Sequence, residues 1–349
     1  MASVKSIADQ VVKTLENYDY ETFLVGASVP HTILDNDDEL RSRFKIKGRD
    51  GLKSQITKML SQKVKLQTAK LVNYSKPDLT VLVSIVDRQI SVNVRSLWLS
   101  GKYVKLKRGL PQRSSTCEVC NGLGCAECGY RGSSLESVQT QITNFLVSTF
   151  EAESCNFVWL GSEDENSLVK PPGRTFYVEV VRPKKRFAMK DGLKSTPKRN
   201  PIFFRSPEIQ IRDLVLLDRR VTEVPTFEIQ AKVYLKRKPE AAALNLDKIK
   251  ALRSNFTAKT VSVRLSRKFR TVQKEIHWIH AKLQEDGSLE LKISCDGGIP
   301  LKKLISGQDD SVLPNLGQYL TSYEIDRAQP FDVMEVKIRE ANALPLHRK

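Results

Sequence analysis

The sequence is poor in histidine and has no long apolar run. Only 4 of its 349 residues are histidine, which disfavours a catalytic centre built from several imidazoles. No stretch approaches the roughly 20 apolar residues that a membrane-spanning helix needs. The N-terminal segment MASVKSIADQ also lacks the apolar centre of a signal peptide. We therefore expect a cytoplasmic protein that does not enter a membrane.

Acidic residues are outnumbered by basic ones. The chain has 57 Lys and Arg against 40 Asp and Glu, a formal net charge of +17 and a pI near 9.6. Such an excess produces a positive surface field and predicts a polyanionic partner. RNA, DNA and an anionic membrane surface are the candidates. Hydrophobic residues make up 40% of the chain, which is enough to bury a sizeable core.

Four basic runs contain an aromatic or apolar residue: KYVKLKR (102–108), RPKKRFAMK (182–190), KVYLKRK (232–238) and RLSRKFR (264–270). Cations neutralise phosphates, and aromatic rings stack on unpaired bases. A single run is more often a solvated face, but four runs favour a nucleic acid. The candidate RNA-binding residues are Lys105, Lys107, Arg108, Lys184, Lys185, Arg186, Arg267, Lys268 and Arg270.

Four of the six cysteines lie in the short stretch CEVCNGLGCAEC. The spacing C-x2-C-x4-C-x2-C predicts a closed, tetrahedral and structural metal site, for which zinc is the preferred ion. Gly122, Gly124 and Gly129 allow the tight turns that such a knuckle requires. Cys155 and Cys295 lie in predicted strands and are expected to be small buried side chains. The predicted ligands are Cys117, Cys120, Cys125 and Cys128.

Hydrophobic periodicity predicts an α+β protein with a mixed sheet. Helices are expected over 4–15, 39–44, 52–64, 240–253, 301–305 and 316–320, with another starting at the Ser133/Glu136 capping box and ending near Phe150. Residues 100–113 are expected to form a basic linker. Strands are expected over 23–29, 79–86, 90–98, 157–161, 175–181, 214–221, 227–235, 275–283, 289–295 and 333–338.

Three consecutive acids, Glu163, Asp164 and Glu165, lie between two predicted strands in LGSEDENSLVKPPGRTF (160–176). Taken alone, an acid in such a turn is more often solvated or structural than catalytic. Spacing alone does not assign it a partner or a role.

Several stretches together resemble the archaeal and eukaryotic tRNA pseudouridine synthases that isomerise uridines 54 and 55 of the T-loop. TFLVGASVP, DDELRSRFKI and VRSLWLSGKYVKLKRGLPQ resemble the THUMP-containing, RNA-binding half of that family. CEVCNGLGCAECGYRG followed by LESVQTQI resembles its cysteine knuckle and the next helix. GSEDENSL with GRTFYVEVVRPKK, RTVQKEIHW, GGIPLKKLISG and LPNLGQYL resemble its catalytic half. The motifs occur in the family's order over nearly the whole chain.

The resemblance implies three parts: a THUMP-containing domain over 1–113, a zinc knuckle over 114–132, and a pseudouridine synthase domain over 133–349. The last would hold a mixed, mainly antiparallel sheet with flanking helices. The implied substrate is tRNA. The isomerisation requires no redox step and no external energy, so no cofactor is expected for the chemistry and zinc is structural. The oligomeric state is not specified, and a monomer is the simplest expectation.

The resemblance also assigns roles to single residues. Asp164 matches the catalytic aspartate, which acts as a nucleophile, and Lys302 would hold that carboxylate ionised and oriented. Phe227 matches the base-stacking tyrosine; the substitution keeps the ring and loses the hydroxyl. Leu301 and Phe331 match apolar positions that line the pocket.

The chain departs from the family at several of these motifs. Ser162 replaces the usual arginine, Glu165 to Leu168 replace V-D-V-R, and Pro300 replaces a common tyrosine. These changes favour one alternative, a non-catalytic, zinc-containing tRNA-binding or tRNA-folding protein of the same family. A thiouridine synthetase or a methyltransferase with a THUMP domain is disfavoured, because the sequence lacks both the S-G-G-x-D-S loop and the N-P-P-Y motif.

Overall fold

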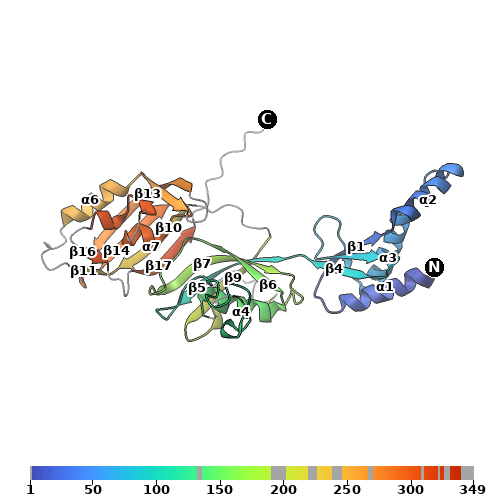
Figure 1. Cartoon of the computed structure of the whole chain (residues 1–349), viewed down its shortest axis with the longest axis horizontal. Coiled ribbons are helices and arrows are strands. Elements are labelled where there is room, and N and C mark those ends of the chain that lie inside the picture. The colour runs from blue at the N-terminus through green and yellow to red at the C-terminus, as the bar shows by residue number, and fades with distance from the viewer. Residues whose placement is uncertain are drawn as a thin grey trace. The chain divides into compact units, whose positions relative to one another are not determined.

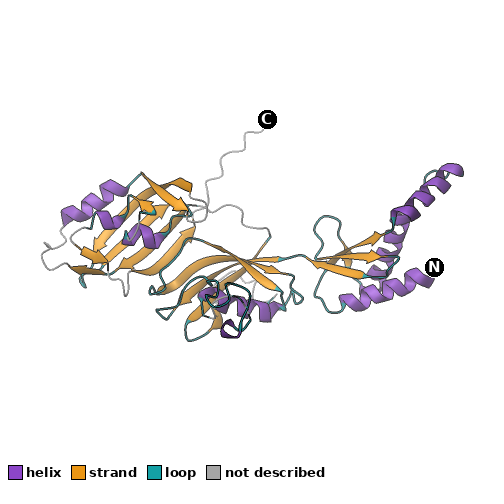
Figure 2. Ribbon diagram, viewed as in Figure 1, coloured by secondary structure: helices purple, strands orange, loops and turns teal. Residues whose placement is uncertain are grey.

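A computed structural model describes residues 2–130, 132, 136–189, 202–218, 226–237, 246–265, 270–307, 310–320, 323–325 and 331–338 (Figures 1 and 2). The chain divides into two compact units. The first comprises residues 1–97, 146–156 and 179–193, and the second comprises residues 98–145, 157–178 and 194–349. Each is described by itself.

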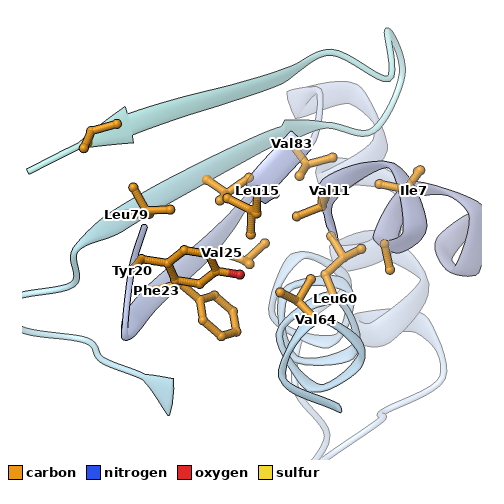
Figure 3. Close-up of a cluster of buried hydrophobic side chains, with 13 residues drawn as sticks. Ile7, Val11, Leu15, Tyr20, Phe23, Val25, Leu60, Val64, Leu79 and Val83 are labelled. Atoms are coloured by element: carbon orange, nitrogen blue, oxygen red, sulfur yellow. The ribbon is translucent and has the colours of Figure 1, made fainter. Parts of the chain in front are cut away.

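The first unit packs helices on a four-stranded sheet with the strand order β2-β1-β3-β4. β1 is parallel to β2 and β3, and β4 is antiparallel to β3. Alternate residues of β1 face the core, as do residues of α1 at helical spacing (Figure 3). The elements are α1 (Ala2–Leu15), β1 (Thr22–Ser28), α2 (His31–Arg43), α3 (Leu52–Thr68), β2 (Leu71–Val72), β3 (Leu79–Ser84) and β4 (Ile90–Val94).

Two elements of this unit differ from the sequence prediction. α2 begins at His31 rather than at residue 39, and none of its described residues is buried. It therefore has no apolar stripe by which periodicity could have marked its start. The single strand predicted over 90–98 is two strands, because Arg95 interrupts it. Its backbone N–H and its guanidinium both bind Asp78, at 2.9 Å and 2.6 Å.

The second unit is built on an eleven-stranded sheet with the order β15-β12-β13-β14-β10-β17-β7-β5-β9-β8, in which β6 also pairs with β7. β17 and β7 are parallel, whereas β10 pairs antiparallel with β14 and β17, β13 with β12 and β14, β12 with β15, and β9 with β5 and β8. A small sheet joins β11 and β16. The α+β class and the mixed, mainly antiparallel sheet are as predicted.

The strands and helices of this unit are bounded as follows: β5 (Leu97–Lys105), η1 (Ala126–Cys128), α4 (Val138–Phe150), β6 (Ser154–Trp159), β7 (Val169–Val181), β8 (Ile202–Arg205), β9 (Ile209–Leu217), β10 (Phe227–Val233), β11 (Leu235–Arg237), α6 (Leu246–Phe256), β12 (Lys259–Leu265), β13 (Arg270–Leu283), β14 (Leu289–Cys295), α7 (Leu301–Ser306), β15 (Val312–Leu313), η2 (Leu316–Gln318), β16 (Tyr323–Ile325) and β17 (Phe331–Ile338).

The predicted basic linker over 100–113 is wrong in its first half, which belongs to β5. Leu97, Leu99 and Tyr103 alternate into the core, as half-buried strands require, and β5 pairs with β9 within the large sheet. At its end Lys105 is buried as well. The lysines of this stretch suggested a solvated segment, but Lys102 lies on the partly exposed face of the strand and Lys105 lies on its buried face.

The helices of this unit partly follow the prediction. α4 starts at Val138, where the Ser137 hydroxyl accepts a hydrogen bond from the Thr140 backbone N–H at 2.9 Å and caps the helix. The predicted cap, Ser133, lies outside the described residues. α6 packs against β13, as Figure 1 shows. Within the described part of the chain, no helix is long and apolar enough to cross a membrane.

Candidate active site and metal centre

The loop between β6 and β7 buries the carboxylate of Asp164, whose relative exposure is 3%. Its Oδ1 accepts a hydrogen bond from the Asn166 N–H at 2.9 Å, and its Oδ2 forms an ion pair with Lys302 at the start of α7. A further bond, from Ser167 N–H to the Asp164 carbonyl at 3.0 Å, closes the turn. Two residues far apart in the sequence are thus brought into direct contact.

A cavity of about 370 Å³ opens onto this ion pair. Its volume is in the range of small-molecule sites. The side chain of Lys302 is 40% exposed, so the cation is partly open to solvent while its partner is buried. The lining residues are Pro111, Gln112, Arg113, Ser162, Glu163, Asp164, Glu165 and Lys302.

A larger cavity, of about 690 Å³, lies at the turn between β13 and β14, beside β10 and β17. Its polar groups already bind one another: Lys232 pairs with Asp286 at 2.5 Å, and Gln230 donates to Glu290 at 2.7 Å. We regard the smaller cavity as the candidate site, because a buried carboxylate and a cation converge there.

A buried ionic cluster joins Glu163 of this loop to side chains of β5 and β7. Glu163 Oε1 is 3.4 Å from Lys105 Nζ, and Glu163 Oε2 is 3.4 Å from the Arg174 guanidinium. The Tyr103 hydroxyl donates to Glu163 Oε2 at 2.7 Å. Burial, together with the charge of Glu163, raises the pKa of Tyr103 well above its usual value, so its hydroxyl remains a donor. Burial lowers the pKa of Lys105, and Glu163 partly opposes that effect.

A second contact holds the far end of the loop. The Arg108 guanidinium binds both carboxylate oxygens of Asp332, at 2.8 Å and 3.0 Å, and the Asn166 carbonyl at 2.5 Å. Asp332 also accepts from Leu168 N–H at 2.8 Å and from the Tyr234 hydroxyl at 2.9 Å. Arg108 and Asp332 therefore tie the loop to the start of β17.

We expect Arg108→Met to lower the free energy of unfolding by about 1.5–3 kcal/mol, because it removes hydrogen bonds to a buried carboxylate. Chemical denaturation followed by circular dichroism measures this loss. Lys107→Met is the matched control. Lys107 is 57% exposed and lies 3.9 Å from Glu208, so its removal should change stability by less than about 1 kcal/mol. Equal losses of stability in both variants would show that the contact between Arg108 and Asp332 does not stabilise the fold.

The four cysteines of the knuckle form one cluster, with all four Sγ atoms within 4.8 Å of one another. Sγ–Sγ distances of 3.8–3.9 Å fit the edge of about 3.8 Å expected for a tetrahedron with metal–sulfur bonds of about 2.3 Å. Backbone N–H groups of Gly124, Cys125 and Gly132 donate to the sulfurs at 3.2 Å. The donor set fits a structural metal.

The glycines of the knuckle adopt the conformations that the sequence predicts. Gly122, Gly124 and Gly129 all have positive φ, at 95°, 90° and 58°. At Gly124 a Cβ would also lie 2.8 Å from the Tyr130 carbonyl oxygen. At Gly124 a side chain is therefore excluded for both conformational and steric reasons.

The knuckle is attached beside the candidate site. Val138 N–H donates to the Pro111 carbonyl at 2.9 Å, and Gln139 N–H donates to the Gln112 carbonyl at 3.0 Å. The chain thus leaves the cavity wall after Arg113 and returns to bond with Pro111 and Gln112 where α4 begins.

We expect native mass spectrometry to find one metal ion bound per chain and Cys128→Ser to lose it, because a closed tetrahedral site needs all four ligands. Cys295→Ser, which removes a buried thiol outside the cluster, is the control and should retain the ion. Retention of the ion by Cys128→Ser would contradict a four-cysteine site.

Two family models match this chain: "Pus10, C-terminal" over residues 98–337 and "Pus10 THUMP domain, archaeal" over residues 7–84. The first covers more than half of the chain. The chain belongs to the Pus10 family. This confirms the family that the ordered motifs indicated, the N-terminal THUMP domain, and an enzyme of the pseudouridine synthase class, an isomerase.

Three Pus10 relatives, each named tRNA pseudouridine synthase Pus10, illustrate the similarity. The Nitrosopumilus maritimus protein is 30% identical over 89% of this chain and 77% of its own length. The Cenarchaeum symbiosum protein is 30% identical over 87% and 71%, and the Methanothrix thermoacetophila protein is 27% identical over 95% and 74%. Among solved structures, a chain of a Cbf5–Nop10–Gar1 complex matches with a TM-score of 0.33 and 11% identity, over 67% of this chain and 48% of that one.

The pocket residues predicted from the Pus10 resemblance are placed as follows. Asp164 and Lys302 meet in the ion pair. Leu301 and Phe331 are buried, at the starts of α7 and β17. Phe227 begins β10, but its side chain lies outside the described part of the structure, so its stacking role stays a prediction.

Two predicted RNA-binding residues need correction. Lys105 is buried in the ionic cluster and cannot reach a phosphate in this structure. Arg186 is buried beside Asp78, with its guanidinium on the Arg95 carbonyl, and desolvation lowers the pKa of Arg186 to about 10. The positive charge of Lys105 and Arg186 suggested that they bind RNA, but both side chains are buried and neither is available at the surface.

The other predicted contacts divide into three groups. Arg108 is 29% exposed and is engaged by Asp332. Lys107 and Lys184 are exposed and Lys185 is partly exposed, so these three remain candidates for phosphate contacts. Arg267, Lys268 and the side chain of Arg270 lie outside the described residues.

Sequence reasoning missed the cluster of Tyr103, Lys105, Glu163 and Arg174. One signal was present, since Leu97, Leu99 and Tyr103 alternate with polar residues in a strand-like period. No feature of the sequence, however, pairs residue 105 with residues 163 and 174.

Proposed function

We propose that this chain is a tRNA pseudouridine synthase that isomerises uridine 54, uridine 55 or both in the T-loop, with Asp164 as the nucleophile. The observation that carries the proposal is the buried Asp164 carboxylate paired with Lys302 in a cavity, in a chain of the Pus10 family. A dry carboxylate with an adjacent cation suits nucleophilic attack on a flipped nucleotide.

In this proposal the Asp164 carboxylate bonds to C1′ as the N1–C1′ bond of uridine breaks. The base rotates, and C5 then displaces the carboxylate and bonds to C1′. The proton on C5 leaves and N1 ends protonated, so substrate and product have the same composition. Lys302 orients the carboxylate and Phe227 stacks on the base, while Leu301 and Phe331 support the pocket from the core, since both are buried and neither lines the cavity. No cofactor takes part in the chemistry.

The partner is a tRNA, which the net charge of +17 favours. Lys107, Lys184 and Lys185 are the proposed phosphate contacts among the described residues. The metal of the knuckle is zinc, because four thiolates at tetrahedral spacing suit it. Its role is to hold the knuckle folded.

The proposal is tested by incubating the full chain with a tRNA transcript and mapping pseudouridine chemically. Transcripts with cytidine at position 54 or at position 55 identify the uridine that is modified. We expect pseudouridine at one or both positions. Pseudouridine only at other positions would overturn the assigned substrate site.

A second candidate function is a tRNA-binding or tRNA-folding protein without catalysis. Ser162 and the segment Glu165–Leu168, which depart from the family motif, favour it. Tight binding of the transcript without any pseudouridine would establish this alternative and overturn the enzyme.

A further inference from the structure

Lys105 donates hydrogen bonds to three backbone carbonyls. Its ammonium lies 3.0 Å from the carbonyl oxygens of Leu110, Asp164 and Glu165. An ammonium group has three N–H donors, and each carbonyl can take one. The side chain is fully buried, so water does not compete for these bonds. One cation thus joins two segments of the chain.

These two segments form the walls of the candidate cavity. Pro111, Gln112 and Arg113, which directly follow Leu110, line one side, and residues 162–165 line the other. Lys105 donates a hydrogen bond to the backbone carbonyl of Asp164, while the carboxylate of Asp164 is paired with Lys302. The position of that carboxylate therefore depends on the ammonium of Lys105.

The charge of Lys105 is not explained by stability alone. Burying an ammonium costs several kcal/mol, and Glu163 offsets this cost only through a 3.4 Å contact. Glu163 must itself be buried and held by Tyr103 and Arg174. Apolar side chains of similar volume are often at least as stabilising as such a network. They could not, however, direct three carbonyls toward one point.

We propose that Lys105 is a positioning residue, which fixes the backbone of Asp164 so that its carboxylate points into the cavity, with Glu163 as the buried counter-charge. Lys105 does not touch the substrate. The inference rests on the proposed role of Asp164 as nucleophile.

The kinetic test compares Lys105→Met with Leu291→Ala in the full chain. Leu291 is buried in β14, and its truncation should cost about 2–5 kcal/mol of stability. We expect Lys105→Met to lower the single-turnover rate at saturating enzyme by about 100-fold, the usual cost of a misplaced reacting group. The Kd for tRNA should stay within about threefold, since Lys105 is buried away from RNA.

Leu291→Ala, measured where circular dichroism shows every variant folded, should keep the wild-type rate. A Lys105→Met enzyme with the rate of Leu291→Ala would overturn the proposal. If Lys105→Met does not fold, Lys105→Arg serves in its place. A planar guanidinium cannot meet three carbonyls around one nitrogen, and we expect about a tenfold lower rate.

Hydrogen exchange tests the same inference without catalysis. The amides of Asn166 and Ser167 bond to Asp164 at 2.9 Å and 3.0 Å. In Lys105→Met they should exchange at least about tenfold faster than in the wild type, and in Leu291→Ala they should not. Unchanged exchange in Lys105→Met overturns the positioning role.

Glu163→Gln separates the two parts of the cluster. This substitution leaves the three carbonyl bonds of Lys105 in place but removes its counter-charge. We therefore expect Glu163→Gln to lower the free energy of unfolding, and to lower the single-turnover rate less than Lys105→Met does. If the wild type forms no pseudouridine, the proposed function fails, and the exchange rates still decide whether Lys105 fixes the loop.

Discussion

Asp164→Asn is expected to abolish pseudouridine formation, with a loss of more than about 10⁴-fold in single-turnover rate. Removal of a nucleophile typically costs this much or more. The amide oxygen of asparagine can still accept the Asn166 N–H bond, and the side chain has the same size. The loop should therefore keep its shape while losing the negative charge that attacks.

The measurement is chemical mapping of pseudouridine after incubation with excess enzyme, alongside a binding assay for the same tRNA. Binding should remain within about threefold of the wild type, because Asp164 is buried and its substitution removes no phosphate contact. Glu165→Gln, which neutralises the neighbouring exposed acid, should lose less than about tenfold in rate. Pseudouridine formed by Asp164→Asn at the wild-type rate would exclude the aspartate as nucleophile.

Lys302→Met is expected to lower the rate by about 10²–10³-fold, the usual effect of removing one electrostatic partner from an active site. Methionine fills the space of the aliphatic stem but leaves a carboxylate of 3% exposure without its cation, a state that burial disfavours. Leu301, buried at the start of α7, should keep the helix in place.

Two comparisons make this result specific. Lys302→Arg retains the charge and should recover at least about tenfold of the lost rate. Lys303→Met, at the next position of α7, removes a lysine whose ammonium donates to the Ser311 hydroxyl at 2.8 Å, and it should lower the rate less than Lys302→Met does. A rate for Lys302→Met equal to that of the wild type would show that the ion pair does not serve catalysis.

The sequence predicted the elements whose apolar periodicity is regular. α1, β1, α3 and β14 lie close to their expected bounds, because each presents one apolar face to a core. α2 was found only in part, because it buries no side chain and has no apolar face. β5 was mistaken for a linker, because a lysine in a buried position is rare enough that charge normally indicates solvent.

The candidate site was predicted only through resemblance. Asp164 and Lys302 are far apart in the sequence, and no periodicity relates a loop after β6 to the start of α7. The family motifs paired them, and the structure places them in contact. The motifs contain Lys105 and Glu163 but gave no indication that the two side chains pair. Recognising that cluster requires knowing that the end of β5 contacts the loop between β6 and β7. That contact depends on how the strands are ordered in the sheet, which no single segment of the sequence specifies.

The cysteine knuckle departs from and returns to one point of the fold, between Gln112 and α4. The two backbone hydrogen bonds at its base, from Val138 to Pro111 and from Gln139 to Gln112, hold its two ends together. The entropy cost of closing a loop grows only slowly with its length. A metal bound to the four cysteine thiolates would also reduce the number of knuckle residues that remain flexible. We therefore expect that a shorter turn can replace the knuckle without moving Pro111 and Gln112, and that this position would accept a grafted peptide tag or a foreign RNA-binding module.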